Sequence, residues 1–277
     1  MGTPKSYLPS MTGRDYGCAY CDEVKRLTLE HIWGDAVEGA FPPHTHFSAK
    51  FPDGVKGDQT IGDVCQDCNN VALSPLDDHG VRLVRRYFIR SFELTPPVSF
   101  EYEDHARFSR WLLKILYNDA RATGTLVEEH AVFRHYIRGV EPAPLEFSVF
   151  GGLLKPEKLP KELAQDIGVD SVEPRFNRIA SFVPETGGTV YTETVYFGRM
   201  IIFYGFIFAV LVWKPDLERE ERARVQVDYG SRHGYTYLRP DRTTAELRYS
   251  RLNVLDFMLG PELGGTSYDR VYRPRLV

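Results

Sequence analysis

The spacing of hydrophobic and polar residues changes along the chain, and it predicts both strands and helices. Residues 27–33 alternate apolar and polar side chains, and residues 59–64 repeat this alternation, so we predict two short strands. Residues 108–116 instead have apolar side chains at i, i+3, i+4 and i+7, which is typical of an amphipathic helix. Asp104 can cap the start of this helix, and Gly124 can end it.

Proline and glycine interrupt the pattern between these segments. Residues 34–60 contain both in clusters, so we expect an extended loop there. A helix can begin directly after residue 68, but we expect Pro75 and Gly80 to interrupt it. Apolar residues then recur at helical spacing over residues 81–92, which predicts a further helix.

The second half of the chain changes to a strand-forming composition. After one more predicted helix over residues 127–137, five segments are strand-like: residues 147–150, 178–183, 190–196, 200–213 and 223–227. Helices followed by strands are typical of an α+β domain with a mostly antiparallel sheet. Thr95-Pro96-Pro97 is the best candidate linker, so we predict one domain over residues 1–95 and a second over residues 96–277.

The composition indicates a folded protein that does not enter the membrane. The chain has 277 residues, of which 43% are hydrophobic, and its formal net charge is only -4. A packed core is therefore expected and general disorder is not. The longest apolar stretch, residues 200–213, is shorter than the roughly 20 residues that span a bilayer. The N-terminus lacks the apolar segment of a secretory signal, so we expect a cytoplasmic protein with no membrane partner.

All four cysteines occur in two Cys-x-x-Cys pairs, Cys18 with Cys21 and Cys65 with Cys68. Each pair can present two thiolates to one ion, and two pairs complete the tetrahedral coordination of zinc. Four protein ligands leave no open position, so this zinc would be structural. The alternatives are reduced structural cysteines and a redox pair. Redox pairs normally open a helix after a βα unit, which neither pair here does.

Three further residues extend the cysteine pattern. Glu30 and His31, followed by Ile32, lie between the two pairs, and Asn69 directly follows the last cysteine. This order resembles the four-cysteine branch of the HNH endonucleases, and the resemblance covers residues 16–80. It implies an N-terminal ββα-metal module, in which zinc fixes a strand and a helix against each other. The α+β domain would follow this module.

The resemblance also implies a reaction, the hydrolysis of phosphodiester bonds in DNA. His31 matches the general base that takes a proton from water, and its ordinary pKa near 6.5 suits that role. A catalytic Mg²⁺ or Mn²⁺ ion prefers oxygen ligands, which indicates Glu30 and the amide oxygen of Asn69. By analogy alone, such a nuclease is expected to serve in a mobile element or in anti-phage defence.

The sequence departs from the family pattern at two points. Thr60, beside Gln59, occupies the place of an asparagine that orients the histidine loop in many members. Trp33-Gly34 replaces a proline that usually follows the Glu-His-Ile motif. The Glu-His dipeptide is also common, and Asn69 can simply cap a helix. The alternative is therefore a non-catalytic, zinc-stabilised protein with a degenerate HNH fold that binds nucleic acid or protein.

Charge limits where nucleic acid can bind. Residues 1–79 contain 6 Lys and Arg against 12 Asp and Glu, so this segment alone is a poor match for phosphate. A basic stripe at helical spacing follows it, made of Arg82, Arg85, Arg86 and Arg90. These arginines are candidates for phosphate contacts, and a solvated helix face is the alternative. The second domain would position the substrate, sense a signal, or bind a protein partner or another copy of the chain.

Overall fold

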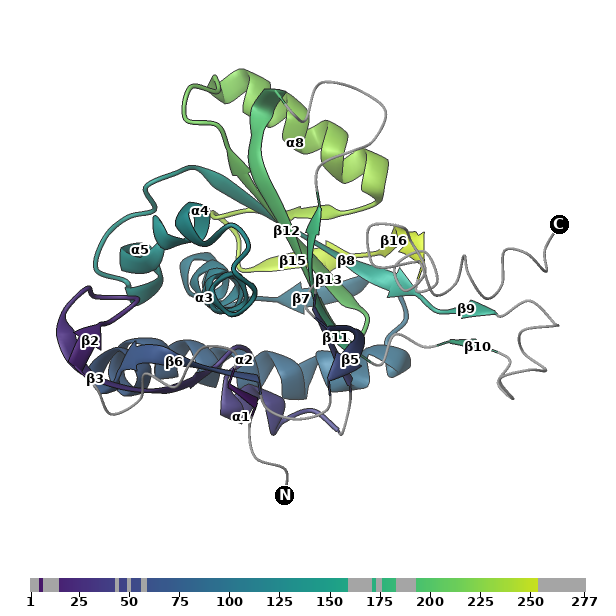
Figure 1. Ribbon diagram of the computed structural model, residues 1–277. Helices are drawn as coiled ribbons and strands as arrows, with labels where there is room; N and C mark the ends of the chain where they lie inside the picture. The colour runs from purple at the N-terminus through teal and green to yellow at the C-terminus, as the bar shows by residue number, and fades with distance from the viewer. Residues whose placement is uncertain are drawn as a thin grey trace, which may run out of the picture.

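The N-terminal part of the chain forms a small sheet that is followed by a helix (Figure 1). The computed structural model describes residues 5–6, 15–42, 45–48, 51–55, 59–158, 171–172, 176–182 and 193–253. The small sheet has the order β1-β6-β3-β2 and consists of β1 (Lys5–Ser6), β2 (Asp15–Gly17), β3 (Val24–His31) and β6 (Gln59–Cys65). β3 and β6 are antiparallel, and they confirm the two strands predicted over residues 27–33 and 59–64.

A continuous helical segment follows the small sheet, so the predicted interruption is wrong. A π-helical segment, η1 (Cys68–Leu73), leads directly into α2 (Ser74–Arg86). Pro75 lies in the first turn of α2, directly after the wider π-helical turn, so the proline is accommodated where the helix changes its hydrogen-bonding pattern. Gly80 lies inside α2 and does not interrupt it. A larger residue does not fit there, because a Cβ atom would be 2.4 Å from the indole ring of Trp111. A short 3-10 helix, η2 (Phe88–Glu93), covers the rest of the predicted helix.

Residues 34–60 do not form a simple extended loop. They contain the short helix α1 (Asp35–Glu38) and a hairpin of β4 (Thr45–Ser48) and β5 (Phe51–Val55). β4 pairs in parallel with β11 (Phe176–Phe182), so this hairpin joins the large C-terminal sheet. β5 is at the edge of that sheet, where Pro52 removes no ladder hydrogen bond that a neighbour needs.

The large sheet confirms the predicted, mostly antiparallel arrangement. Its order is β14-β8-β13-β12-β11-β4-β5, with β16 paired to β8. The strands not yet given are β8 (Phe147–Lys155), β12 (Val195–Phe203), β13 (Phe206–Trp213), β14 (Thr236–Leu238) and β16 (Tyr249–Asn253). The apolar stretch over residues 200–213 is two strands of a hairpin, which turns at Tyr204 and Gly205 with φ of 47° and 92°. Two small ribbons complete the sheets: β7 (Val98–Glu101) with β15 (Thr244–Leu247), and β9 (Glu157–Lys158) with β10 (Ser171–Val172).

The helix predicted from Asp104 to Gly124 is confirmed as α3 (His105–Thr123). The Asp104 side chain accepts hydrogen bonds from the backbone N–H groups of Ala106 and Arg107, and Gly124 ends the helix in the left-handed conformation. The helix predicted over residues 127–137 is divided into α4 (Val127–Ala131) and α5 (Arg134–Arg138).

The strand predicted over residues 223–227 is wrong, because this segment lies in α8 (Arg219–His233). The alternation that suggested a strand involves Val225, which is buried, and Val227, which is 74% exposed. Glu221 pairs with Arg224 along one helix face, and Gly234 ends the helix in the left-handed conformation. These local signals outweigh two β-branched residues.

The large sheet is covered on both faces (Figure 1). α8 packs on one face, where Tyr229 contacts Phe150 of β8. α3 packs on the other face, where Trp111 stacks on Phe203 with ring centroids 5.0 Å apart. The hydrophobic cluster on the α3 side also contains Leu27 of β3, so the small sheet shares a core with the large one. The division at residue 95 stays a prediction.

Across the ranges given above, no helix is both long enough and apolar enough to cross a membrane.

Candidate metal centre and adjoining polar site

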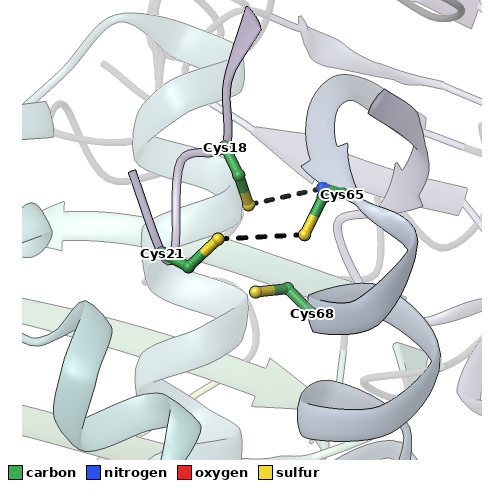
Figure 2. Close-up of side chains that lie close together, drawn as sticks. All are labelled: Cys18, Cys21, Cys65 and Cys68. Atoms are coloured by element: carbon green, nitrogen blue, oxygen red, sulfur yellow. Dashed lines mark hydrogen bonds between the residues drawn. The ribbon is translucent and has the colours of Figure 1, made fainter. Parts of the chain in front are cut away.

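The four cysteines come together from two separate turns (Figure 2). Cys18 and Cys21 lie on the turn between β2 and β3, Cys65 ends β6, and Cys68 begins η1. All four Sγ atoms lie within 4.8 Å of one another, and those of Cys21 and Cys65 are 3.9 Å apart. No disulfide joins them.

This geometry fits a tetrahedral metal ion. Zn–S bonds of about 2.3 Å place the sulfur atoms of a tetrahedral site roughly 3.8 Å apart. The backbone N–H of Cys65 donates to Cys18 Sγ at 3.3 Å. Burial alone would raise the pKa of the Cys18 thiol. The hydrogen bond from Cys65 and other backbone hydrogen bonds outweigh burial, so the pKa of Cys18 is lowered. Burial and the neighbouring thiolates raise the pKa of Cys68, so a cation is needed to ionise all four together. The cluster can therefore hold a structural metal such as zinc.

The C-terminal half of α3 holds the first cysteine turn in place. Tyr117 donates its hydroxyl hydrogen to the carbonyl oxygen of Ala19, at 3.0 Å. Arg121 forms an ion pair with Asp63 of β6, and its guanidinium lies over the rings of Tyr20 and Tyr117. This turn, which carries Cys18 and Cys21 and is named the metal turn, is thus fixed by hydrogen bonds from a buried helix, in addition to the ion that it can bind.

Glu30 is buried and paired, which the sequence did not indicate. Its side chain is 4% exposed, and its Oε1 atom lies 2.7 Å from the Nζ atom of Lys114, which has no exposed surface. Lys114 also donates to both carboxylate oxygens of Asp77, at 2.6 and 2.7 Å. Asn118, one turn further along α3, donates to the same Oε1 of Glu30 at 3.3 Å.

The charges in this buried group depend on one another. Burial alone would lower the pKa of Lys114, but Glu30 and Asp77 outweigh it and raise that pKa above its ordinary value. Burial raises the pKa of Asp77 to about 6, against the opposing effect of Lys114. Gly34 closes this side of the group, since a Cβ atom there would lie 2.7 Å from the Asp77 carboxyl. Its φ of 80° also favours glycine.

His31 is the last residue of β3 and lies in a different environment from Glu30. Its side chain is 24% exposed, and its Nε2 atom is 3.9 Å from Oδ1 of Asp35 at the start of α1. Its backbone oxygen accepts a hydrogen bond from Asn118 Nδ2 at 3.0 Å. The β3–β6 ladder shifts register between Thr28 and Glu30, which leaves Leu27 and Glu30 as its buried residues there.

Asn69 connects the start of the helical segment to the same strand. Its Nδ2 donates to the backbone oxygen of Leu29 at 2.8 Å and to Thr28 Oγ1 at 3.2 Å. It therefore lies beside the peptide that precedes Glu30. Among the described residues, none donates to Asn69 Oδ1 or to Glu30 Oε2. Each of these two proposed metal ligands is held through one polar atom, Nδ2 in Asn69 and Oε1 in Glu30, and within the described part of the chain its remaining side-chain oxygen has no hydrogen-bond donor.

Thr60 does not visibly orient the histidine loop. It lies opposite His31 in the β3–β6 ladder and is buried, but within the described part of the chain its Oγ1 has no hydrogen-bond partner. Among the same residues, the four cysteines are the only group of three or more His, Cys, Asp or Glu side chains close enough to share one ion. A second metal ion would therefore need Asn69, water and substrate in addition to Glu30.

The basic stripe is largely paired with acidic residues. Three of its arginines form ion pairs with glutamates at 2.7–3.3 Å: Arg82 with Glu103, Arg86 with Glu101, and Arg90 with Glu93. These side chains are 40–64% exposed, so the pairs are weak and exchangeable. Arg85 is exposed on the same helix. Phosphate binding by this stripe stays a prediction.

Comparison with known proteins does not identify a family. No protein-family model, no curated protein and no solved structure matches this chain. The assignment of a class therefore depends on the geometry of the chain's own residues.

Proposed function

We propose that the protein is a metal-dependent HNH-type endonuclease that hydrolyses DNA, with a structural zinc ion at the four cysteines. One observation carries this proposal: the juxtaposition of Asn69 with the Glu30-His31 end of β3. Two antiparallel strands and a helix bring them together, and the four-cysteine cluster lies at the junction of those elements. A ββα arrangement with zinc at its junction has the order of parts that the HNH resemblance implies.

The polar groups can take separate roles in the proposed reaction, proton transfer and metal binding. His31 is partly exposed, so it can accept a proton from water when it is neutral. Glu30 Oε2 and Asn69 Oδ1 would hold a hard divalent ion, since oxygen ligands suit Mg²⁺ and Mn²⁺. When bound, that ion would stabilise the scissile phosphate and the leaving oxygen. Lys114 and Asn118 would orient Glu30 through its other oxygen, as outer hydrogen bonds commonly do for metal ligands.

A second candidate is a non-catalytic binding protein with the same zinc-stabilised scaffold. The observation that favours it is Lys114, whose ammonium group already forms ion pairs with both Glu30 and Asp77. A divalent ion beside this ammonium group is repelled, which lowers the affinity of the site. The partner would then be a nucleic acid or a protein, bound without hydrolysis.

Nicking of a supercoiled plasmid separates the two candidates. We expect cleavage by the wild-type protein with Mg²⁺ or Mn²⁺, and a rate about 10²–10⁴-fold lower for His31→Ala, since a general base contributes about that much. His135→Ala is the matched control, because it removes another partly exposed histidine far along the chain and should cleave normally. Equal rates for wild type and His31→Ala would contradict the mechanism, and binding without cleavage would favour the second candidate.

A further inference from the structure

Tyr20 links the four-cysteine cluster to the interior of the protein. It lies between Cys18 and Cys21, and its side chain has no exposed surface. Its hydroxyl donates to Asn118 Oδ1 at 2.7 Å. A residue within the metal turn therefore makes a buried hydrogen bond to α3, and the position of its hydroxyl depends on the position of the turn.

Asn118 receives this bond on one side and makes two others on the opposite side. Its Oδ1 accepts from Tyr20 and from Arg121, and its Nδ2 donates to the backbone oxygen of His31 at 3.0 Å and to Glu30 Oε1 at 3.3 Å. Asn118 is fully buried. Because two donors face Oδ1, the carboxamide has one favourable orientation, in which its NH2 group faces Glu30 and His31.

The body of α3 gives these bonds a fixed frame. Trp111 and Leu112 pack in the core, and Arg121 pairs with Asp63 of β6. Tyr117 bonds to Ala19, so α3 contacts the same metal turn through a second, separate hydroxyl. A shift of the Tyr20 hydroxyl is therefore not absorbed by movement of the helix. It changes the hydrogen bonds of the Asn118 carboxamide instead.

We propose that Asn118 is a positioning residue that couples the four-cysteine cluster to His31 and Glu30 through the sequence of hydrogen bonds Tyr20–Asn118–His31. An ion at the four cysteines fixes the turn, the turn fixes the Tyr20 hydroxyl, and Asn118 then holds the last peptide of β3. The consequence for hydrolysis rests on the proposed function, whereas the structural coupling does not. The cluster thus controls the candidate catalytic end of β3 at a distance, without contributing a ligand there.

Two tyrosines provide a matched test. Tyr20→Phe removes only the hydroxyl that bonds to Asn118, and Tyr117→Phe removes only the hydroxyl that bonds to Ala19. The full-length zinc-loaded proteins are compared at one pH by zinc content, thermal unfolding and the imidazole NMR signal of His31, which is assigned by its absence in His31→Ala. We expect Tyr20→Phe to keep one zinc ion and to shift the His31 signal. Tyr117→Phe should leave that signal in place, because the bound zinc ion still fixes the turn and Tyr20 keeps its hydrogen bond to Asn118.

Cleavage adds a second measurement. Misplacement of a reacting group by less than 1 Å is costly, so we expect Tyr20→Phe to lower kcat roughly 10-fold with little change in KM. Asn118→Asp, which keeps the acceptor atoms and loses the donor, should lower it further and also shift the His31 signal. An unchanged His31 signal in both variants would overturn the coupling. If no protein cleaves DNA but the signal shifts, the proposed function is wrong and the coupling is retained.

Discussion

Lys114 has no contact with solvent and lies between two carboxylates. Its Nζ atom is 2.6–2.7 Å from oxygens of Glu30 and Asp77. Taking these three charges out of water is costly, and only their mutual attraction offsets that cost. Once these carboxylates are buried, the fold therefore needs the positive charge of Lys114, whether or not Glu30 also binds a metal ion.

Removal of Lys114 tests this account of the buried charges. Lys114→Met leaves two carboxylates without a cation, and we expect the free energy of unfolding to fall by about 3–5 kcal/mol. Arg224→Met is the matched control, since it removes a cation from Glu221 on the exposed face of α8 and should have little effect. Urea denaturation measures both. Equal effects of the two substitutions would contradict the account.

The candidate site could be predicted from the sequence only in part. The cysteine pairs and the Asp104 cap depend on neighbouring residues, and the structure brings the cysteines together and confirms the cap. The partners of Glu30 could not be predicted, because Lys114 is more than 80 residues away in sequence. One signal was present: Lys114 interrupts the apolar run from Trp111 to Leu116, and a charge inside such a run implies a buried partner.

At the scale of elements, α2 and α3 approach each other closely at one glycine. A Cβ atom on Gly80 would meet the indole of Trp111 at 2.4 Å, which is closer than real Cβ contacts come. Glycine in a helix interior normally costs stability, so its presence in α2 indicates that the contact with α3 outweighs that cost. The sequence pattern alone suggested the opposite, a break in the helix.

Gly80→Ala should therefore destabilise the protein, although alanine favours helices. We expect the free energy of unfolding to fall by about 1–3 kcal/mol, as overpacking of a core generally causes. In a Trp111→Leu background the indole is absent, and the same substitution should lose its penalty. A double-mutant cycle by urea denaturation measures the difference. A stabilising effect of Gly80→Ala in the wild-type background would show that the two helices are not in this contact.

The errors in predicting elements have a common physical origin. The hairpin of β4 and β5 is stabilised by pairing with β11, which is more than 120 residues away, so no local pattern could predict it. The segment of residues 223–227 contains Val225 and Val227, whose strand preference is outweighed by capping and ion pairs along α8. The strand pair β3–β6 was predictable, since its alternation of apolar residues is local.

At the scale of the whole molecule, buried histidines connect folding to pH. His130 is 1% exposed, its Nδ1 lies 2.7 Å from the backbone oxygen of Leu126, and its ring contacts Phe197. Burial, together with the nearby charge of Arg199, lowers the pKa of His130 to about 3. Burial likewise lowers the pKa of His79 to about 4. Both histidines are neutral in the folded protein at pH 5–6.

These two buried histidines should therefore make the fold less stable in acid. Between pH 6.5 and about 4 the unfolded chain binds a proton at each of these histidines, and the folded chain does not, so stability falls as the pH falls. Each histidine lowers the free energy of unfolding by up to about 1.4 kcal/mol for each pH unit by which the pH falls in this range. We expect His130→Phe to lower the slope of the unfolding free energy against pH by the amount that corresponds to about one bound proton. Urea denaturation at pH 7, 6 and 5 measures this slope, and an unchanged slope would contradict the assignment.

One buried helix, α3, joins the N-terminal segment, whose four cysteines can hold a metal ion, to the large sheet. α3 contacts the metal turn, the end of β3 and the large sheet, where Asp119 pairs with Arg199 of β12. The four cysteines would organise this arrangement, and the proposed reaction would take place at the other end of β3. One metal ion would thus be structural, and another would take part in hydrolysis.

The most direct test measures plasmid cleavage against added Mn²⁺ while the zinc content is followed in the same samples. The account predicts one zinc ion per chain throughout, no cleavage before Mn²⁺ is added, and saturable cleavage afterwards that His31→Ala slows about 10²–10⁴-fold without loss of zinc. Cleavage that depends on the zinc alone, or that is the same with and without His31, would contradict it.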